Sequence, residues 1–215
     1  MLFRSMIKEN KKLIIVTSVV TLLPMVVGLL LWNKLPDTMA THFNINNQAD
    51  GYSSKAFAVF GIPGFIFLCQ LICVGATCVD PKHRNINKKI YPVLLGTFPV
   101  VSLLVSSLMF AYSLGYATDI GFIMSLMIGV LYIVLGNYIP KVKQNYTVGF
   151  RVRWTLDDED NWYHTHRFGG KCMVIGGILM IAASPVINIW LLITIAFVPA
   201  LLPILYSYIY YKKKQ

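Results

Sequence analysis

Charged residues are scarce along this chain. They make up 13% of its 215 residues, whereas soluble domains carry about 25%. Acidic residues are the scarcest, with nine Asp and Glu residues against 19 Lys and Arg residues. This shortage excludes a protein whose surface faces water over most of its area, and 56% of the residues are hydrophobic. The composition therefore predicts an integral membrane protein.

Motifs for catalysis and metal binding are also missing. The chain has no HExxH, no GxSxG and no paired aspartates inside an apolar run, so we expect no enzyme and no cofactor. His164 and His166 lie two residues apart, about 200° on a helix, and cannot share a metal ion there. No CxxC pair occurs, and the cysteines fall in or beside apolar runs, where they serve as packing residues. They are Cys69, Cys73, Cys78 and Cys172.

Long runs without charge determine the expected fold class. A helix needs about 20 apolar residues to cross about 30 Å of hydrocarbon. The uncharged runs are 13–31, 56–79, 90–118, 120–140 and 172–211. The last is long enough for two spans, with a turn at Ser184-Pro185 and Asn188. The sequence thus predicts an all-α integral membrane protein with six transmembrane helices and both termini in the cytoplasm.

Few polar side chains interrupt the predicted spans. Gln70 is the one strongly polar residue well inside the second span, so we expect it to form hydrogen bonds with a neighbouring helix. Small residues, including Gly176-Gly177, predict close helix packing in the fifth span without identifying the partner helix.

The basic residues are distributed unevenly between the two sides of the membrane. With the N-terminus in the cytoplasm, all but two of the 19 Lys and Arg residues lie inside, and only Lys34 and Lys55 lie outside. Each short loop obeys the positive-inside rule separately. Topology and the lipid bilayer therefore account for the net charge of +10, and we expect no direct nucleic-acid binding. The predicted location is the cell membrane.

Residues 33–55 form the one sizeable outer loop of this topology. Asn46-Asn47 and Asp50-Gly51 are turn formers, because Asn, Asp and Gly tolerate positive φ. His42 is expected to donate or accept a hydrogen bond that stabilises the loop.

The longest polar passage, 136–170, lies on the predicted cytoplasmic side. Apolar and basic residues alternate over 148–154, which predicts an extended segment. Thr155 or Asp157 is the expected N-cap of a helix that starts near Asp158 and continues into the fifth span. On that helix Trp162 and His166 share one face at i, i+4, as do the next pair along the chain, Tyr163 and Arg167.

The outer loop resembles a short bacterial segment of unknown function, DUF1648. The resemblance is carried by an outer-loop motif, defined here as Pro36, His42, Phe43, Asn44, Asp50, Gly51 and Lys55. That segment usually has Gly where this chain has Asn47 and Pro where it has Ala49. Because Asn can adopt a left-handed conformation, we expect the turn to be preserved.

The polar passage resembles the signature of the SdpI family of bacterial multi-pass membrane proteins. We define a cytoplasmic-loop motif from it: Gly136, Asn137, Asn145, Gly149, Arg151, Trp154, Thr155, Leu156, Trp162, Thr165, His166 and Arg167. Pro140, Lys141, Lys143, Tyr146, Glu159, Gly169 and Gly170 also match. The family usually reads Arg-Thr-Pro-Trp where this chain has 151–154, and Pro where it has Gln144.

This resemblance implies a bacterial plasma-membrane protein that gives immunity to a secreted membrane-active peptide toxin. It also implies a cytoplasmic transcriptional repressor as a second partner, which would receive a signal from the cytoplasmic loop. The alternative is a transporter or channel for a small solute or lipid. No ionisable residue lies deep in a predicted span, which counts against coupled transport.

The predicted segments follow from this topology. They are a basic cytoplasmic N-terminus (1–12), a DUF1648-like region with the outer loop (13–79), a basic inner loop, third span and outer turn (80–119), an SdpI-like region with the cytoplasmic loop 140–171 (120–211), and a basic tail (212–215).

Overall fold

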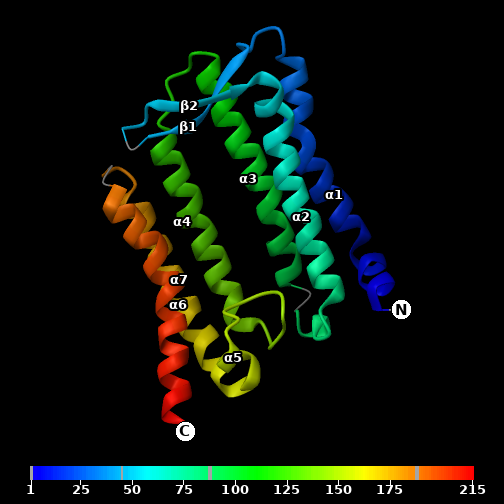
Figure 1. The fold of residues 1–215 in the computed structure, drawn as a ribbon, viewed down its shortest axis with the longest axis vertical. Coiled ribbons are helices and arrows are strands. Elements are labelled where there is room, and N and C mark those ends of the chain that lie inside the picture. Colours follow the sequence, from blue (N-terminus) through cyan, green and yellow to red (C-terminus); the bar gives the residue numbers. More distant parts are fainter. Residues whose placement is uncertain (1, 45, 87–88, 187–188) are drawn as a thin grey trace. The chain divides into compact units, whose positions relative to one another are not determined.

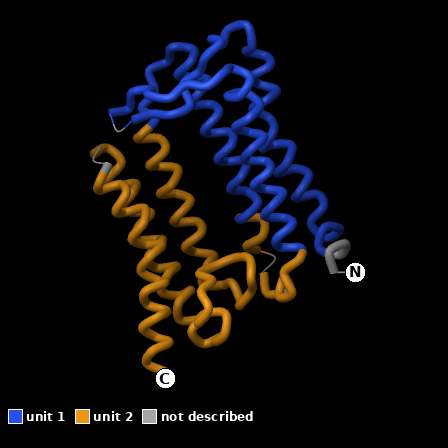
Figure 2. The backbone as a smooth tube through the Cα atoms, in the orientation of Figure 1, with its two compact units in different colours: residues 1–78, 94–120 blue, residues 79–93, 121–215 orange. Residues whose placement is uncertain are grey.

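The computed structural model describes residues 2–44, 46–86, 89–186 and 189–215. The chain forms two compact units, which Figure 2 colours separately. Unit 1 contains residues 1–78 and 94–120, and unit 2 contains residues 79–93 and 121–215.

Helices account for most of both units (Figure 1). The α-helices are α1 (Leu2–Leu30), α2 (Ile62–Val79), α3 (Ile90–Ser113), α4 (Ile120–Tyr138), α5 (Arg153–Asp157), α6 (Glu159–Ala183) and α7 (Ile189–Lys213). A π-helical segment, Phe57–Gly61, precedes α2, and 3-10 turns lie at His83–Asn85 and Ile139–Lys141.

Five helical segments of the described chain are long and apolar enough to cross a membrane. They are Met6–Leu30, Phe57–Val79, Ile90–Ser113, Ile120–Lys141 and Trp190–Lys213. They correspond to the first four predicted spans and the last one. Helix α6 is not among them, because its apolar part covers only 172–183, and that part is about 18 Å long at 1.5 Å per residue. The predicted turn at Ser184-Pro185 is present, whereas Asn188 lies outside the described residues.

The prediction of an all-α fold was wrong for the outer loop. Strands β1 (Thr38–Phe43) and β2 (Ala49–Ser54) pair as an antiparallel hairpin, with Thr38 opposite Ser54 and Phe43 opposite Ala49. The Asp50-Gly51 pair, predicted to form a turn, lies inside β2. Strand pairing across the loop overrides the local turn preference of these two residues.

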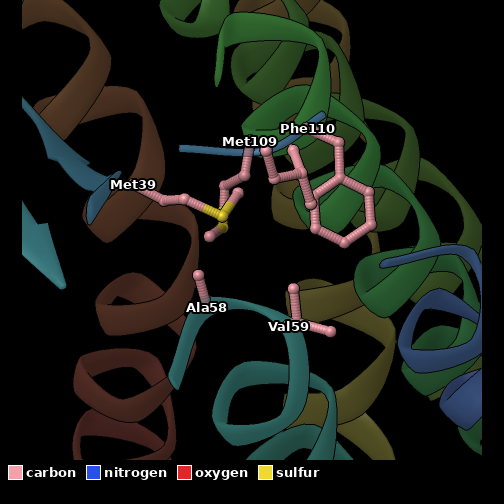
Figure 3. Packing of buried hydrophobic residues seen from close by; sticks show 6 residues of the cluster. Met39, Ala58, Val59, Met109 and Phe110 are labelled. Carbon is pink, nitrogen blue, oxygen red and sulfur yellow. The ribbon is translucent and has the colours of Figure 1, made fainter. Parts of the chain in front are cut away.

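Unit 1 is held together by apolar packing beneath this hairpin. Buried residues from the bend before β1, from β1, from the π-helical segment and from α3 form one cluster: Leu35, Met39, Ala58, Val59, Met109 and Phe110. Figure 3 shows Met39 reaching toward Met109, with Ala58 and Val59 close by. The hairpin is therefore fixed on the ends of the unit 1 helices and is not a loose loop.

A polar network inside unit 1 confirms the prediction made for Gln70. The Gln70 side chain is fully buried. Its amide donates to Thr17 Oγ1 at 2.8 Å and to Ser18 Oγ at 3.2 Å, and its oxygen accepts from Thr21 Oγ1 at 2.8 Å. The network links α2 to α1, as expected for a polar side chain surrounded by hydrocarbon.

Glycines bring the helices of unit 2 close together. A Cβ on Gly177 would lie 2.5 Å from the carbonyl oxygen of Gly129, and one on Gly170 would lie 2.6 Å from that of Gly136. The backbones of α4 and α6 therefore touch at two points, seven residues apart on each helix. Gly176 packs against Pro199 of α7 on another face of α6. The partners of the Gly176-Gly177 pair are thus α7 and α4, respectively.

Candidate functional site

The outer-loop motif lies within the hairpin and its two ends. His42 Nδ1 is 2.5 Å from Asp50 Oδ1 across the two strands, and both side chains are exposed. Gly51 faces His42 so closely that a Cβ there would lie 2.7 Å from His42 Cβ. The expected hydrogen bond of His42 is confirmed, and Gly51 is needed for the close approach.

Two asparagines shape the turn between β1 and β2. Asn44 Oδ1 accepts from the amides of Asn46 and Gln48, at 2.9 and 3.0 Å. Asn47 has φ 59°, so the left-handed conformation expected at this position is confirmed. Its side chain also accepts from the amide of Ile120 at 3.0 Å. Asn47 thereby ties the hairpin to the start of α4, a role that the sequence pattern did not reveal.

Lys55 anchors the other end of the hairpin. Its ammonium lies 3.1 Å from the Trp32 carbonyl oxygen, 3.1 Å from Asp37 Oδ1 and 5.1 Å from the Trp32 ring centroid. Phe43 packs edge-on against Tyr112 of α3, and Pro36 is exposed. Within the motif, His42 and Asp50 form an exposed polar pair, while Lys55 and Phe43 attach the hairpin to the helices.

His166 is the centre of the cytoplasmic-loop motif. The side chain is 1% exposed and stacks on Trp162, with ring centroids 3.9 Å apart. The Phe150 amide donates to Nε2 at 3.0 Å, and Nδ1 lies 2.8 Å from the Trp162 carbonyl oxygen. Since an amide can only donate, Nε2 is the acceptor and the proton sits on Nδ1. The predicted shared face of Trp162 and His166 is confirmed.

Burial keeps this imidazole neutral. It lowers the pKa of His166 from 6.5 to about 4, although the hydrogen bond to the Trp162 carbonyl acts in the opposite direction. In the neutral ring, Nε2 accepts from the Phe150 amide. In an imidazolium, Nε2 would carry a proton and face this amide as a second donor, so the hydrogen bond would be lost. The fold of the loop therefore depends on the charge state of His166.

Gly149 allows the loop to pass over His166. Its φ is +121°, a conformation that side chains rarely adopt, and a Cβ there would collide with His166 Nε2. Asn145 precedes this crossing and is fully buried. Its Oδ1 accepts from the amides of Thr147 and Val148 at 2.8 and 2.7 Å, which closes a tight turn.

Thr155 closes the loop on its far side. Its hydroxyl lies 2.8 Å from the Phe150 carbonyl oxygen and accepts from the Val152 amide at 3.1 Å. The predicted extended segment over 148–154 was wrong, because Gly149 turns the chain and α5 already begins at Arg153. Solvent exposure still alternates along this segment: Arg151 and Arg153 are exposed, whereas their neighbours are partly buried.

The start of α6 differs by one residue from the prediction. Asp158, rather than Thr155 or Asp157, is the N-cap, and its Oδ1 accepts from the Asp160 amide at 2.9 Å. Lys214, the residue that follows α7, lies 2.8 Å from Asp158 and 2.7 Å from Asp160. The hydrogen bonds from Lys214 lower the pKa of both carboxyls.

Both tryptophans of the motif donate hydrogen bonds to other residues of unit 2. Trp162 Nε1 donates to the Val142 carbonyl at 2.8 Å, and Trp154 Nε1 donates to Ser207 Oγ of α7 at 2.7 Å. Thr165 donates to Asn161, whose amide in turn donates to the Ser207 carbonyl at 3.0 Å. These bonds connect the loop to α6 and α7.

The remaining members of the motif lie outside this buried network. Asn137, Arg151 and Arg167 are exposed, Leu156 is partly buried, and Gly136 contacts Gly170. Arg167 donates to Tyr163 Oη at 2.9 Å, which confirms that this i, i+4 pair shares a face. The motif is therefore divided between a folded interior and an exposed rim.

Two residues of this unit were missed by the sequence analysis. Asp80 is buried and accepts from the Tyr146 amide and from Thr147 Oγ1, both at 2.8 Å. Gln144 donates to the Thr155 and Leu156 carbonyls and accepts from Lys82. The one available signal was Gln144 itself, which replaces a family proline. Among the described residues, no group of three or more His, Cys, Asp or Glu residues could hold a metal ion.

Together, these features define a helical multi-pass membrane protein with a hydrogen-bonded polar loop and a small hairpin. The SdpI/YfhL protein family model matches residues 141–207, and the DUF1648 model matches residues 19–67. Residues 141–207 are therefore similar to the SdpI/YfhL protein family, and residues 19–67 are similar to the DUF1648 segment.

A curated relative supports this placement over nearly the full length of the chain. Immunity protein SdpI of Bacillus subtilis (strain 168) is 26% identical over 202 residues, which cover 93% of this chain and 96% of that protein. The chain is thus a distant homologue of immunity protein SdpI. No solved structure matches it.

Proposed function

We propose that this chain is an immunity protein that gives a bacterial cell resistance to a secreted membrane-active peptide toxin. The observation that carries the proposal is the relation to immunity protein SdpI over 93% of the chain. The buried network around His166 supports it, because it gives the matched family region a defined local structure.

The proposed topology has six spans, with both termini in the cytoplasm of a bacterial plasma membrane. Helix α6 supplies the fifth span through its apolar half, where Gly177 packs against α4 and Gly176 packs against α7. This topology places the hairpin outside and residues 140–171 inside. Reporter fusions after Gln48 and after Lys143 test it, and a cytoplasmic signal from the Gln48 fusion would contradict it.

The hairpin is the proposed contact for the peptide. It presents the exposed pair His42 and Asp50 above a buried apolar cluster. Because this cluster fixes the hairpin on the π-helical segment and on α3, a peptide bound outside would strain these helix ends directly.

The exposed rim of the cytoplasmic loop is the proposed contact for a transcriptional repressor. Trp154 and Trp162 form hydrogen bonds inside unit 2, so they are not available to a partner. The surface left for a partner includes Arg151, Arg153 and the half-exposed rings of Tyr146 and Tyr163. Arg and Tyr are frequent in binding hot spots.

Expression in a bacterium that is sensitive to such a peptide and lacks its own immunity protein tests the proposal. We expect the minimal inhibitory concentration of the peptide to rise at least about fourfold, with growth unchanged in its absence. The double variant His42→Ala, Asp50→Ala should lose most of this protection, because it removes the exposed polar pair.

The matched control is Gln48→Ala, which truncates an exposed side chain of the same hairpin and should protect as the wild type does. Membrane fractionation establishes that all three proteins accumulate equally. Equal sensitivity of cells with and without the membrane-inserted wild-type chain, across a panel of such peptides, would overturn the proposal.

A further inference from the structure

A basic groove lies in unit 2 where the end of α4 meets α6. Its volume is about 560 Å³. Three exposed cations line it: Lys141 after α4, and Arg167 and Lys171 one turn apart on α6. Gly136 and Gly170, where the two helix backbones touch, also line it. We refer to this cavity as the basic groove.

The groove gathers positive charge without a neighbouring carboxylate. None of its lining residues is acidic, and none of the three cations takes part in an ion pair among the described residues. Two of them are instead positioned by aromatic rings. The Lys141 ammonium lies 4.9 Å from the Tyr138 ring centroid, and the Arg167 guanidinium lies 5.3 Å from that of Tyr163. Three like charges held around one cavity favour an anionic ligand.

The character of the groove changes along α6 from basic to apolar. Val174 and Ile175 line its other part, one turn beyond Lys171 toward the apolar half of the helix. Ile175 is 58% exposed. A soluble phosphate would use the basic part alone, whereas a phospholipid places a phosphate beside an acyl chain. On the α6 surface, basic side chains are followed by apolar ones, and a phospholipid has the same order of a charged headgroup and then an acyl chain.

We propose that the basic groove binds an anionic phospholipid of the inner leaflet. The headgroup phosphate lies between Lys141, Arg167 and Lys171, and an acyl chain follows Val174 and Ile175 into the bilayer. Basic pockets between transmembrane helices on the cytoplasmic side bind anionic lipid headgroups. The inference depends on the proposed topology and is independent of toxin immunity, so either proposal can fail alone.

Lipid retention by the purified full-length chain tests the inference. The protein is reconstituted with phosphatidylglycerol, or with phosphatidylcholine of the same acyl chains, and lipids that remain bound after mild detergent exchange are counted by native mass spectrometry. We expect the wild type to retain phosphatidylglycerol with a preference of about tenfold or more. The double variant Arg167→Gln, Lys171→Gln should lose that preference, and Lys141→Gln alone should reduce it.

The matched control is Lys212→Gln, Lys213→Gln, which removes the same charge from the C-terminal end of α7 outside the groove. It should retain the wild-type preference to within about twofold. An equal loss in this control would show general charge attraction and overturn the inference. It would also be overturned by an equal retention of the two lipids, or by displacement of the lipid with millimolar inorganic phosphate. The Lys141→Gln variant keeps the test valid if the double variant does not fold.

Discussion

Replacing Gly149 with alanine is expected to unfold the cytoplasmic loop while leaving the spans inserted. The new Cβ would collide with Nε2 of His166, and this ring cannot move because Trp162 holds its other side. The variant also carries the backbone cost of positive φ, about 1–2 kcal/mol, and loses the hydrogen bond from Phe150, about 1 kcal/mol. We expect a loss of about 3 kcal/mol in thermal unfolding in detergent, with faster hydrogen exchange over 145–155.

Gly115 and Gly75 provide matched controls for this experiment. Gly115 has φ +84° but no atom within 4 Å of a built Cβ, so Gly115→Ala isolates the backbone cost. Gly75→Ala adds a methyl group in open space on a helix and should be neutral or slightly stabilising. If Gly149→Ala and Gly115→Ala destabilise equally, the packing of Gly149 on His166 has no energetic role.

Acidification is expected to produce the second large effect, through His166. Its pKa is about 4 in the folded loop, against 6.5 for an ordinary histidine. Above pH 6.5 both the folded and unfolded loops carry the neutral ring. Between pH 6.5 and 4 the unfolded loop takes up a proton that the folded loop does not, so stability falls as pH falls. The total loss is on the order of 3 kcal/mol and levels off below about pH 4.

Thermal unfolding between pH 7.5 and 4 measures this dependence. In His166→Gln an amide oxygen can still accept from Phe150 but cannot titrate, so this variant should be less stable at pH 7.5 and should lose the His166 part of the slope. Gly75→Ala, which changes no titratable group, should keep the wild-type slope. An unchanged slope in His166→Gln would show that acid acts on other groups.

The two effects give the family signature in this chain a structural meaning. One stack is formed by Gly149, His166 and Trp162. The turns on either side of this stack are closed by hydrogen bonds of Asn145 and Thr155. These residues set the shape of the loop, while Arg151 and Arg167 point outward from it. Variants of the interior residues should therefore impair any function of the loop through its fold. Variants of the exposed arginines should leave the fold of the loop intact, so any loss of function in them would report on partner binding.

The sequence by itself determined the features that depend on near neighbours along the chain. Uncharged runs predicted five helices that the structure contains, because the hydrocarbon thickness sets the same length for each. The i, i+4 spacing placed Trp162 and His166 on one face, since 3.6 residues make one turn. The left-handed conformation of Asn47 followed from the turn chemistry of its own side chain.

Only the tertiary structure decided which distant residues meet. Local turn preferences at Asp50-Gly51 gave no sign of the strand opposite, so the hairpin was missed. The bonds from Asp80 to Tyr146 and Thr147 join segments more than 60 residues apart. The buried state of His166 and its proton position come from Phe150 and the Trp162 carbonyl. Such contacts depend on how the chain packs. Hydrophobic periodicity predicts which face of a helix or strand is buried, but it does not predict which other segment packs against that face.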